Sequence, residues 1–179
     1  MRRSHVSETH RIMALTRLNT NAYGATVDLA SNVTGTLANS NLAAGTVIQV
    51  VNAKYAVEAS SASTSFSDTG LTASITPSST SSKILIHVHQ NAPKKAGNDD
   101  MDITLFRGVT SLSRITGFTM FTATTTQLYG QTTSTAYLDS PSSTSSLTYK
   151  TQFKRPDGSG TVYIQSPGES TMTLMEIAG

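Results

Sequence analysis

Two histidines separated by a single residue, His87 and His89, have the spacing in this sequence that most clearly suggests chemistry. Side chains at positions i and i+2 of a β-strand point to the same side, so the two imidazoles would face one environment. Three copies of the pair around a threefold axis would offer six nitrogen ligands to a transition metal. A solvent-facing or intersubunit pair on a polar face explains the pattern with fewer assumptions. We therefore expect no metal or other cofactor, and His87 and His89 stand as the metal-ligand candidates.

An acidic cluster, Asp99, Asp100 and Asp102, follows the basic pair Lys94 and Lys95. Aspartate is common in turns because its side chain bonds to the nearby backbone, and the spacing matches no EF-hand calcium loop. Depolymerase chemistry would need paired carboxylates in a cleft. The many serines lack a G-x-S-x-G motif and have no placed His and Asp partners. The sequence therefore predicts a protein that is not an enzyme.

Short apolar runs that alternate with polar residues fill the chain from Thr46 onward, and they would position the histidine pair and the charged residues. The runs lie at Thr46–Ala53, Leu71–Ile75, Ile84–Val88, Ile103–Leu105, Ala136–Asp139, Leu147–Phe153, Val162–Ile164 and Thr171–Ala178. A period of two indicates β-strands, and no stretch keeps a helical period. We predict an all-β domain of roughly seven to nine strands, an antiparallel, jelly-roll-like sandwich.

One turn carries a specific chemical signature. Arg155-Pro156-Asp157-Gly158 places Pro at the second and Gly at the fourth turn position, where β-turns favour these residues. We therefore predict that Leu147–Phe153 forms a hairpin with Val162–Ile164.

Two of the predicted strands carry apolar residues on both faces. Thr46–Ala53 (TVIQVVNA) is apolar on each side, as a strand covered from both sides would be. Thr171–Ala178 begins with Met172 and Leu174 on one face and changes face at Met175, which a bulge or a fully covered strand would explain. Together the two strands offer more apolar surface than one core needs, so we expect a homotrimer.

The composition limits the remaining functions. The 179 residues are 37% hydrophobic and only 13% charged, with a net charge of +2. The basic residues are scattered or lie in short clusters, and no continuous phosphate-facing surface is indicated, so we expect no nucleic-acid partner. No apolar run reaches the ~18 residues that cross a bilayer, and the beginning of the chain lacks the apolar stretch of a secretory signal. We therefore expect no membrane insertion.

The chain divides into three parts that differ in composition and apolar periodicity. Residues 1–12 are polar and aperiodic, and they predict a flexible tip. Residues 13–45 are poor in large apolar side chains and are interrupted by Asn and Gly, so they cannot build a core of their own. We expect an extended arm there, laid against sister chains or a neighbouring protein, and one β domain at residues 46–179.

Several blocks of the sequence, taken in order, resemble one family. They are Thr64–Ile86, Leu138–Lys150, Gly160–Ile164 and Ser170–Ile177. The series is similar to phage fibre and virion-surface domains that are widespread in cyanophages and marine phages, and Ala25–Leu37 resembles the linker before many phage fibre knobs. The resemblance implies a trimeric, jelly-roll-like domain with no known chemistry, anchored by its N-terminus. The charged segment Pro93–Asp102 departs from the Gly/Asn-rich loop expected at that place.

The resemblance and the arm-plus-domain layout imply a structural virion protein of a tailed phage, on the tail or the capsid surface. In a tail or baseplate fibre, the domain would bind a host-surface glycan or protein. In the alternative, a head fibre or capsid decoration (cement) protein, it would stabilise the capsid. Residues 13–45 would bind other virion proteins in either case. The host-contact candidates lie where the strand pattern is interrupted: Lys94, Lys95, Asn98, Asp99, Asp100, Phe118 and Tyr129.

Overall fold

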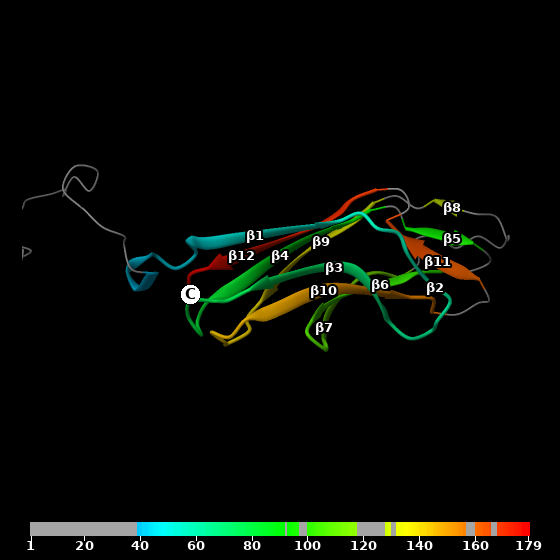
Figure 1. The fold of residues 1–179 in the computed structure, drawn as a ribbon. Coiled ribbons are helices and arrows are strands. Elements are labelled where there is room, and N and C mark those ends of the chain that lie inside the picture. Colours follow the sequence, from blue (N-terminus) through cyan, green and yellow to red (C-terminus); the bar gives the residue numbers. More distant parts are fainter. Residues whose placement is uncertain are drawn as a thin grey trace, which may run out of the picture. The chain divides into compact units, whose positions relative to one another are not determined.

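The computed structural model describes residues 39–91, 93–96, 100–117, 128–129, 132–156, 160–165 and 168–179. All described residues belong to one compact unit, Leu37–Gly179. The predicted tip at residues 1–12 and the arm up to residue 38 lie outside the described residues. The remainder of the predicted arm contains a short 3-10 helix, η1 (Asn39–Asn41), which leads toward the first strand (Figure 1).

The described residues form twelve strands in three antiparallel sheets, which confirms the predicted all-β fold. The strands are β1 (Val47–Tyr55), β2 (Ala59–Ser61), β3 (Ser67–Ile75), β4 (Lys83–Gln90), β5 (Lys94–Ala96), β6 (Asp102–Arg107), β7 (Thr110–Gly117), β8 (Leu128–Tyr129), β9 (Thr133–Asp139), β10 (Leu147–Lys154), β11 (Thr161–Ile164) and β12 (Ser170–Ile177). Their orders define the β1 sheet (β1-β12-β4-β9), the β3 sheet (β3-β10-β6-β7) and the small sheet (β2-β11-β5-β8).

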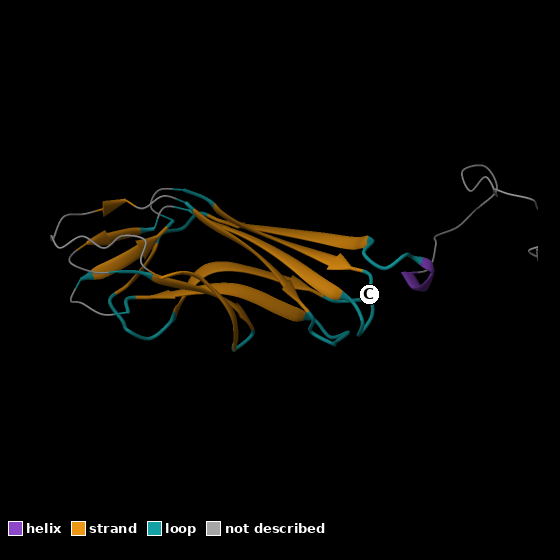
Figure 2. Cartoon of the chain, turned by 180° about the vertical axis from the view of Figure 1, so that it is seen from behind, coloured by secondary structure: helices purple, strands orange, loops and turns teal. Residues whose placement is uncertain are grey.

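The β1 and β3 sheets lie face to face and enclose the main core (Figures 1 and 2). In β4, Ile84, Ile86 and Val88 point inward and are buried, while the residues between them point outward; in β12, Met172 and Leu174 take the inward positions. The β3 sheet contributes Leu71, Ala73, Ile75, Leu105 and Tyr149. Each buried Ile or Leu stabilises the fold by about 1.5–3 kcal/mol, so the period-two pattern is enforced by burial.

The small sheet lies at the end of the sandwich that is remote from the C-terminus (Figures 1 and 2). A second core cluster, separate from the main core, joins it to the β3 sheet. Val162 and Ile164 of β11 pack there with Ile103, Phe153 and Met101. The small sheet is therefore fixed to the sandwich by its own buried contacts.

The eight long strands of the two large sheets pair in a nested order. The β6–β7 hairpin is innermost, followed by the pairs β4–β9, β3–β10 and, outermost, β1–β12. Apart from that hairpin, successive long strands alternate between the two sheets. The hairpin closes through a two-residue turn whose first residue, Gly108, has a φ of +56°, a conformation that glycine adopts without steric cost.

The predicted hairpin between Leu147–Phe153 and Val162–Ile164 is wrong. Strand β10 lies between β3 and β6, and β11 lies between β2 and β5 in a different sheet. After β10 the backbone N–H of Arg155 donates to the carbonyl of Ser63 (3.0 Å), and the Arg155 guanidinium donates to the carbonyl of Gly160 (2.8 Å). Because both sides of β10 are already paired, the chain turns away into the small sheet.

Strand β12 does not change face, contrary to the sequence pattern. It keeps one register with β4 from Thr171 to Ile177, and the inward position after Leu174 is occupied by Glu176, which is fully buried. The one register shift at β12 involves its other neighbour, β1, near Gln49. Strand β1 has an outer face on which Val47 is 49% and Val50 is 57% exposed, so the described residues do not cover both of its faces as predicted.

Candidate functional site

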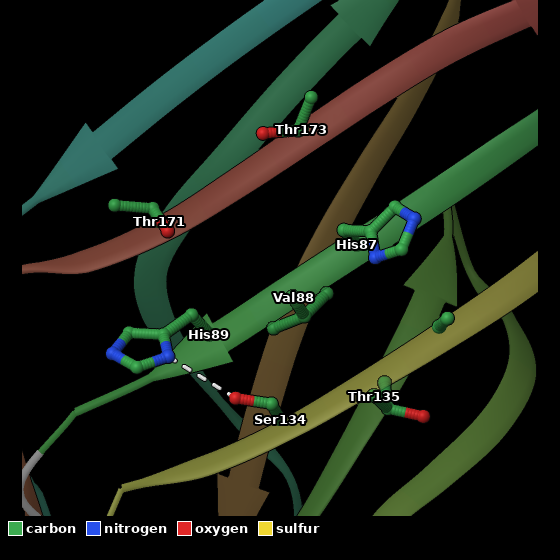
Figure 3. Close-up of a pocket in the computed structure, with 8 residues that line it drawn as sticks. His87, Val88, His89, Ser134, Thr135, Thr171 and Thr173 are labelled. Carbon is green, nitrogen blue, oxygen red and sulfur yellow. Dashed lines mark hydrogen bonds between the residues drawn. The ribbon is translucent and has the colours of Figure 1, made fainter.

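The outer face of the β1 sheet carries the predicted histidine pair. His87 and His89 are both exposed, and Val88 between them is buried in the core. The prediction that the two imidazoles lie on one side of the strand is therefore confirmed, and Figure 3 shows both rings on the same side of β4.

Strands β12 and β9 flank the histidines and form a shallow depression with them (Figure 3). Thr173 and Ala136 lie directly opposite His87, and Thr171 and Ser134 lie opposite His89. The Nδ1 atom of His89 is 3.1 Å from Oγ of Ser134, within hydrogen-bonding distance. The depression is lined by hydroxyls, imidazoles and two small apolar side chains and is open, so it can hydrogen-bond to a partner surface but does not enclose a ligand.

The pair does not make a metal site by itself. Among the described residues, no three His, Asp, Glu or Cys side chains lie close enough together to hold an ion. A site built on His87 and His89 would need further ligands from outside the described residues, so the expected absence of a metal stays a prediction.

The contact between His89 and Ser134 resembles part of a hydrolytic dyad. A nucleophilic serine needs a base that is itself oriented by a third group, together with donors for the oxyanion. Within the described part of the chain, no carboxylate hydrogen-bonds to the His89 ring. The geometry therefore gives no support to a hydrolase, and the expectation of a non-enzyme stays a prediction.

Of the predicted host-contact residues that the structure describes, Lys94, Lys95 and Tyr129 lie in the small sheet. Lys94 is largely buried: its Nζ lies 4.5 Å from the centroid of the Tyr163 ring and 4.0 Å from Oε2 of Glu58. Lys95 is fully buried and Asp100 is nearly so. Because they are buried, neither of these two can touch a partner in this conformation. The sequence did not indicate this, since position in a charged segment does not reveal which side chains point inward.

The other host-contact candidates lie mostly beyond what the structure describes. Asn98, Asp99 and Phe118 fall outside the described residues. The backbone of Tyr129 is described, and it pairs with Lys94 between β8 and β5. The structure thus brings Tyr129 next to Lys94 in the small sheet, as two segments that are far apart in the sequence.

A buried polar triad stands between the large sheets and was not anticipated from the sequence. The Tyr149 hydroxyl donates to Oδ2 of Asp139 (2.7 Å), and Nη1 of Arg107 donates to the same oxygen (2.6 Å). Burial raises the pKa of the Tyr149 hydroxyl well above its ordinary value, and the hydrogen bond to Asp139 raises it further. The phenol therefore stays protonated and acts as a donor that ties β10 to β9. These three residues come from separate strands, so no local motif signals them.

The sequence also did not identify a row of apolar side chains beside the histidines, on the same outer face. Val50, Met175, Leu85 and Leu138 lie directly opposite one another across the four strands of the β1 sheet. The only sequence signal for it was the apolar character of both faces in the first and last strands.

Comparison with known proteins gives no assignment. No protein-family model matches the chain, and a search of curated proteins returns no match. Among the residues that the structure describes, no helix has the length and apolar character needed to cross a membrane.

Proposed function

We propose that this chain is a structural virion protein of a tailed phage: a homotrimeric tail or baseplate fibre, anchored through residues 13–45, whose β domain attaches to the host surface. We also propose that the sandwich is a jelly roll. The nested strand order supports the jelly roll directly, because a ribbon of paired strands folded over into two sheets is the connectivity of two Greek keys. Through the jelly roll it also supports the virion role. Viral capsid and lectin domains use this architecture, and the ordered sequence blocks favour a virion protein.

The direction of the chain indicates which end of the domain would meet the host. The chain enters the sandwich through η1 and β1, at the end where the C-terminus also lies, and the small sheet lies at the opposite end (Figure 1). If residues 13–45 are held by the particle, the small sheet and its connections face outward. Loops on a rigid β scaffold can vary their contacts without disturbing the core, which suits receptor recognition.

The burial of individual side chains refines the host-contact candidates. Lys95 and Asp100 serve as buried parts of the scaffold, so neither is carried into the proposed contact surface. Lys94 remains, because its ammonium lies over the Tyr163 ring and beside the partly exposed Glu58. A cation next to an aromatic ring can bind a sugar or an acidic group, and a trimer repeats each weak contact three times.

The test compares phage particles that carry Lys94→Ser together with Phe118→Ala with particles that carry Lys150→Ser. Lys150 is a matched control because it also pairs with one carboxylate, that of Asp68 at 2.8 Å, but on a strand of the β3 sheet. We expect the first variant to adsorb to host cells about tenfold less, and the control to adsorb normally. Normal adsorption by both variants, combined with particles that become fragile when the protein is omitted, would instead establish capsid decoration.

A further inference from the structure

The outer face of the β1 sheet carries a continuous apolar row, made of Val50, Met175, Leu85 and Leu138. Each member lies directly opposite the next in the strand register, so all four point to the same side of the sheet. Val50 is 57% exposed and Leu138 is 51% exposed, while Met175 and Leu85 between them are partly exposed. The row therefore spans the full width of the sheet on the side that faces away from the core.

A second, shorter row extends the apolar surface toward the end of the sheet where the C-terminus lies. Val47 lies opposite Ile177, which is on the same face of β12 as Met175. Large apolar side chains that are contiguous on a soluble domain mark an interaction surface, whereas scattered ones do not. We define Val47, Ile177 and the four-residue row together as the apolar patch.

We infer that the apolar patch is the surface through which copies of this chain pack against one another. The inference rests on the homotrimer in the proposed function and names the face that would build it. Obligate interfaces between copies have an apolar centre with a polar rim. The β1 sheet has this layout, because the rows next to the patch carry hydroxyls, amides and imidazoles, among them Asn52, Thr173, His87 and Ser134.

The charges on this face favour a second copy as the occupant. The ammonium of Lys54 pairs with Glu169 at 2.9 Å, so its charge is offset within the chain. Lys83 lies opposite Ile177, at the border of the patch. A face with so little net charge can meet an identical face without strong repulsion, and it offers few charged groups to a strongly charged partner.

The path of the chain points the same way. After 38 preceding residues, the described domain begins with η1, and the chain then enters β1, the edge strand that bears Val47 and Val50. When the N-terminal segments of several copies are held together at one site, their β1 strands start close to one another. The patch then lies where the neighbouring domains meet.

The first experiment places charge in the patch of the full chain. Val50→Glu combined with Leu138→Glu is compared with Val57→Glu combined with Val109→Glu, since these two valines are 63% and 96% exposed elsewhere on the surface. Light scattering measures the mass, and circular dichroism checks the fold. We expect wild type and control at three times the 18.9 kDa chain mass, and the patch variant at the mass of one chain. A patch variant that folds and stays trimeric at micromolar concentration would overturn the inference.

The second experiment leaves the patch apolar and tests whether it is covered. The sequence has no cysteine, so Leu138→Cys and Val109→Cys each introduce one thiol. We expect the thiol at position 138 to react with maleimide about tenfold more slowly than that at position 109, because the copies must first separate, and at the same rate in denaturant.

The outcomes distinguish the claim of a homotrimer from the claim that the apolar patch is its interface. A wild-type monomer would remove the homotrimer from the proposed function. A trimer in which both thiols react equally would refute the patch as the interface and leave the homotrimer standing. A monomer with a protected thiol at position 138 would show that the chain's own N-terminal residues cover the patch, which also overturns the inference.

Discussion

Replacing the buried carboxylate of Glu176 should destabilise the domain in a pH-dependent way. Oε1 of Glu176 accepts hydrogen bonds from the backbone N–H and hydroxyl of Ser78 (2.7 and 2.6 Å) and from the hydroxyl of Ser82 (2.7 Å). Oε2 accepts one from Nε2 of Gln49 (2.5 Å). The carboxylate thus joins β12 and β1 to the connection between β3 and β4.

The magnitude for Glu176→Gln follows from this arrangement. A hydrogen bond to a charged group contributes about 1.5–3 kcal/mol, and one between neutral groups about 0.5–1.5 kcal/mol. The new amide oxygen keeps the bonds from Ser78 and Ser82 in weaker form, but its NH₂ group faces the NH₂ of Gln49. If Gln49 turns its amide over, it loses its bond to the carbonyl of Thr76 (2.8 Å). We therefore expect the free energy of unfolding to fall by about 2 kcal/mol at pH 7.

The pH dependence has a definite sign. Burial would raise the pKa of the Glu176 carboxyl, but the hydrogen bonds from Ser78, Gln49 and Ser82 outweigh it and hold that pKa below its ordinary value of 4.5. A carboxyl with a lowered pKa in the folded state stabilises the fold fully above the unfolded value and loses this effect as pH falls through the folded value. The difference between wild type and Glu176→Gln should therefore be constant near neutrality and shrink below pH 4.5.

The assay is urea unfolding at one fixed chain concentration, followed by circular dichroism, at pH 7 and at successively lower pH. Asp68→Asn is the control, because this carboxylate pairs with Lys150 but its side chain is 58% exposed. An exposed ion pair contributes about 0–1 kcal/mol, so the control should change stability little. Equal unfolding midpoints for wild type and Glu176→Gln at pH 7, or a difference that does not shrink in acid, would refute the reasoning.

Two further substitutions test packing and backbone geometry by the same unfolding assay. Tyr149→Phe removes the donor to Asp139 and should lower the free energy of unfolding by about 1–2 kcal/mol; an unchanged value would show that the Tyr149 hydroxyl adds nothing to stability. Gly70 and Gly45 share a φ of +89°, but a Cβ on Gly70 would overlap the Tyr55 ring while one on Gly45 meets open space. Gly45→Ala should therefore cost about 1 kcal/mol and Gly70→Ala clearly more, and equal costs would contradict the predicted overlap.

Local alternation predicted the strands that line the core, because burial on one face leaves a period of two in the sequence. Ile84, Ile86 and Val88 are the clearest case, and all three are buried. The strands that were missed are either very short, as β2, β5 and β8 are, or Ser/Thr-rich, as β7 is. Residues such as these are held in strands by their neighbours and by backbone pairing, and the chain's own pattern does not show it.

The sequence could not determine which strands pair with one another. The turn residues after Phe153 correctly indicate that β10 ends there, but a turn does not determine which strand is paired next. The ladder of β10 is filled by β3 and β6, whose register is set by burial across the sandwich. The inward position of Glu176 was not predicted, for a similar reason: its hydrogen-bond donors come from residues about 100 positions away.

The candidate site was predicted where it depends on one strand and missed where it depends on several. The shared side of His87 and His89 follows from the geometry of β4 alone. The burial of Lys95 and Asp100 depends on how the small sheet packs against the sandwich, which no local pattern records. Contact surfaces are therefore harder to derive from sequence than strand faces.

The outward apolar residues of β1 and β12 fit the proposed interface between copies of the chain. Val50 and Met175 face away from the core, and one row further along the same strands Asn52 and Thr173 show that polar side chains fit a solvated face equally well. An exposed edge strand with apolar side chains is an aggregation hazard unless it is covered. In the proposed trimer that hazard is removed by the neighbouring copy, and His87, which lies opposite Thr173, then falls on the polar border of the interface. Both histidines lie on the outer face of β4, the face that also carries Leu85 of the apolar patch.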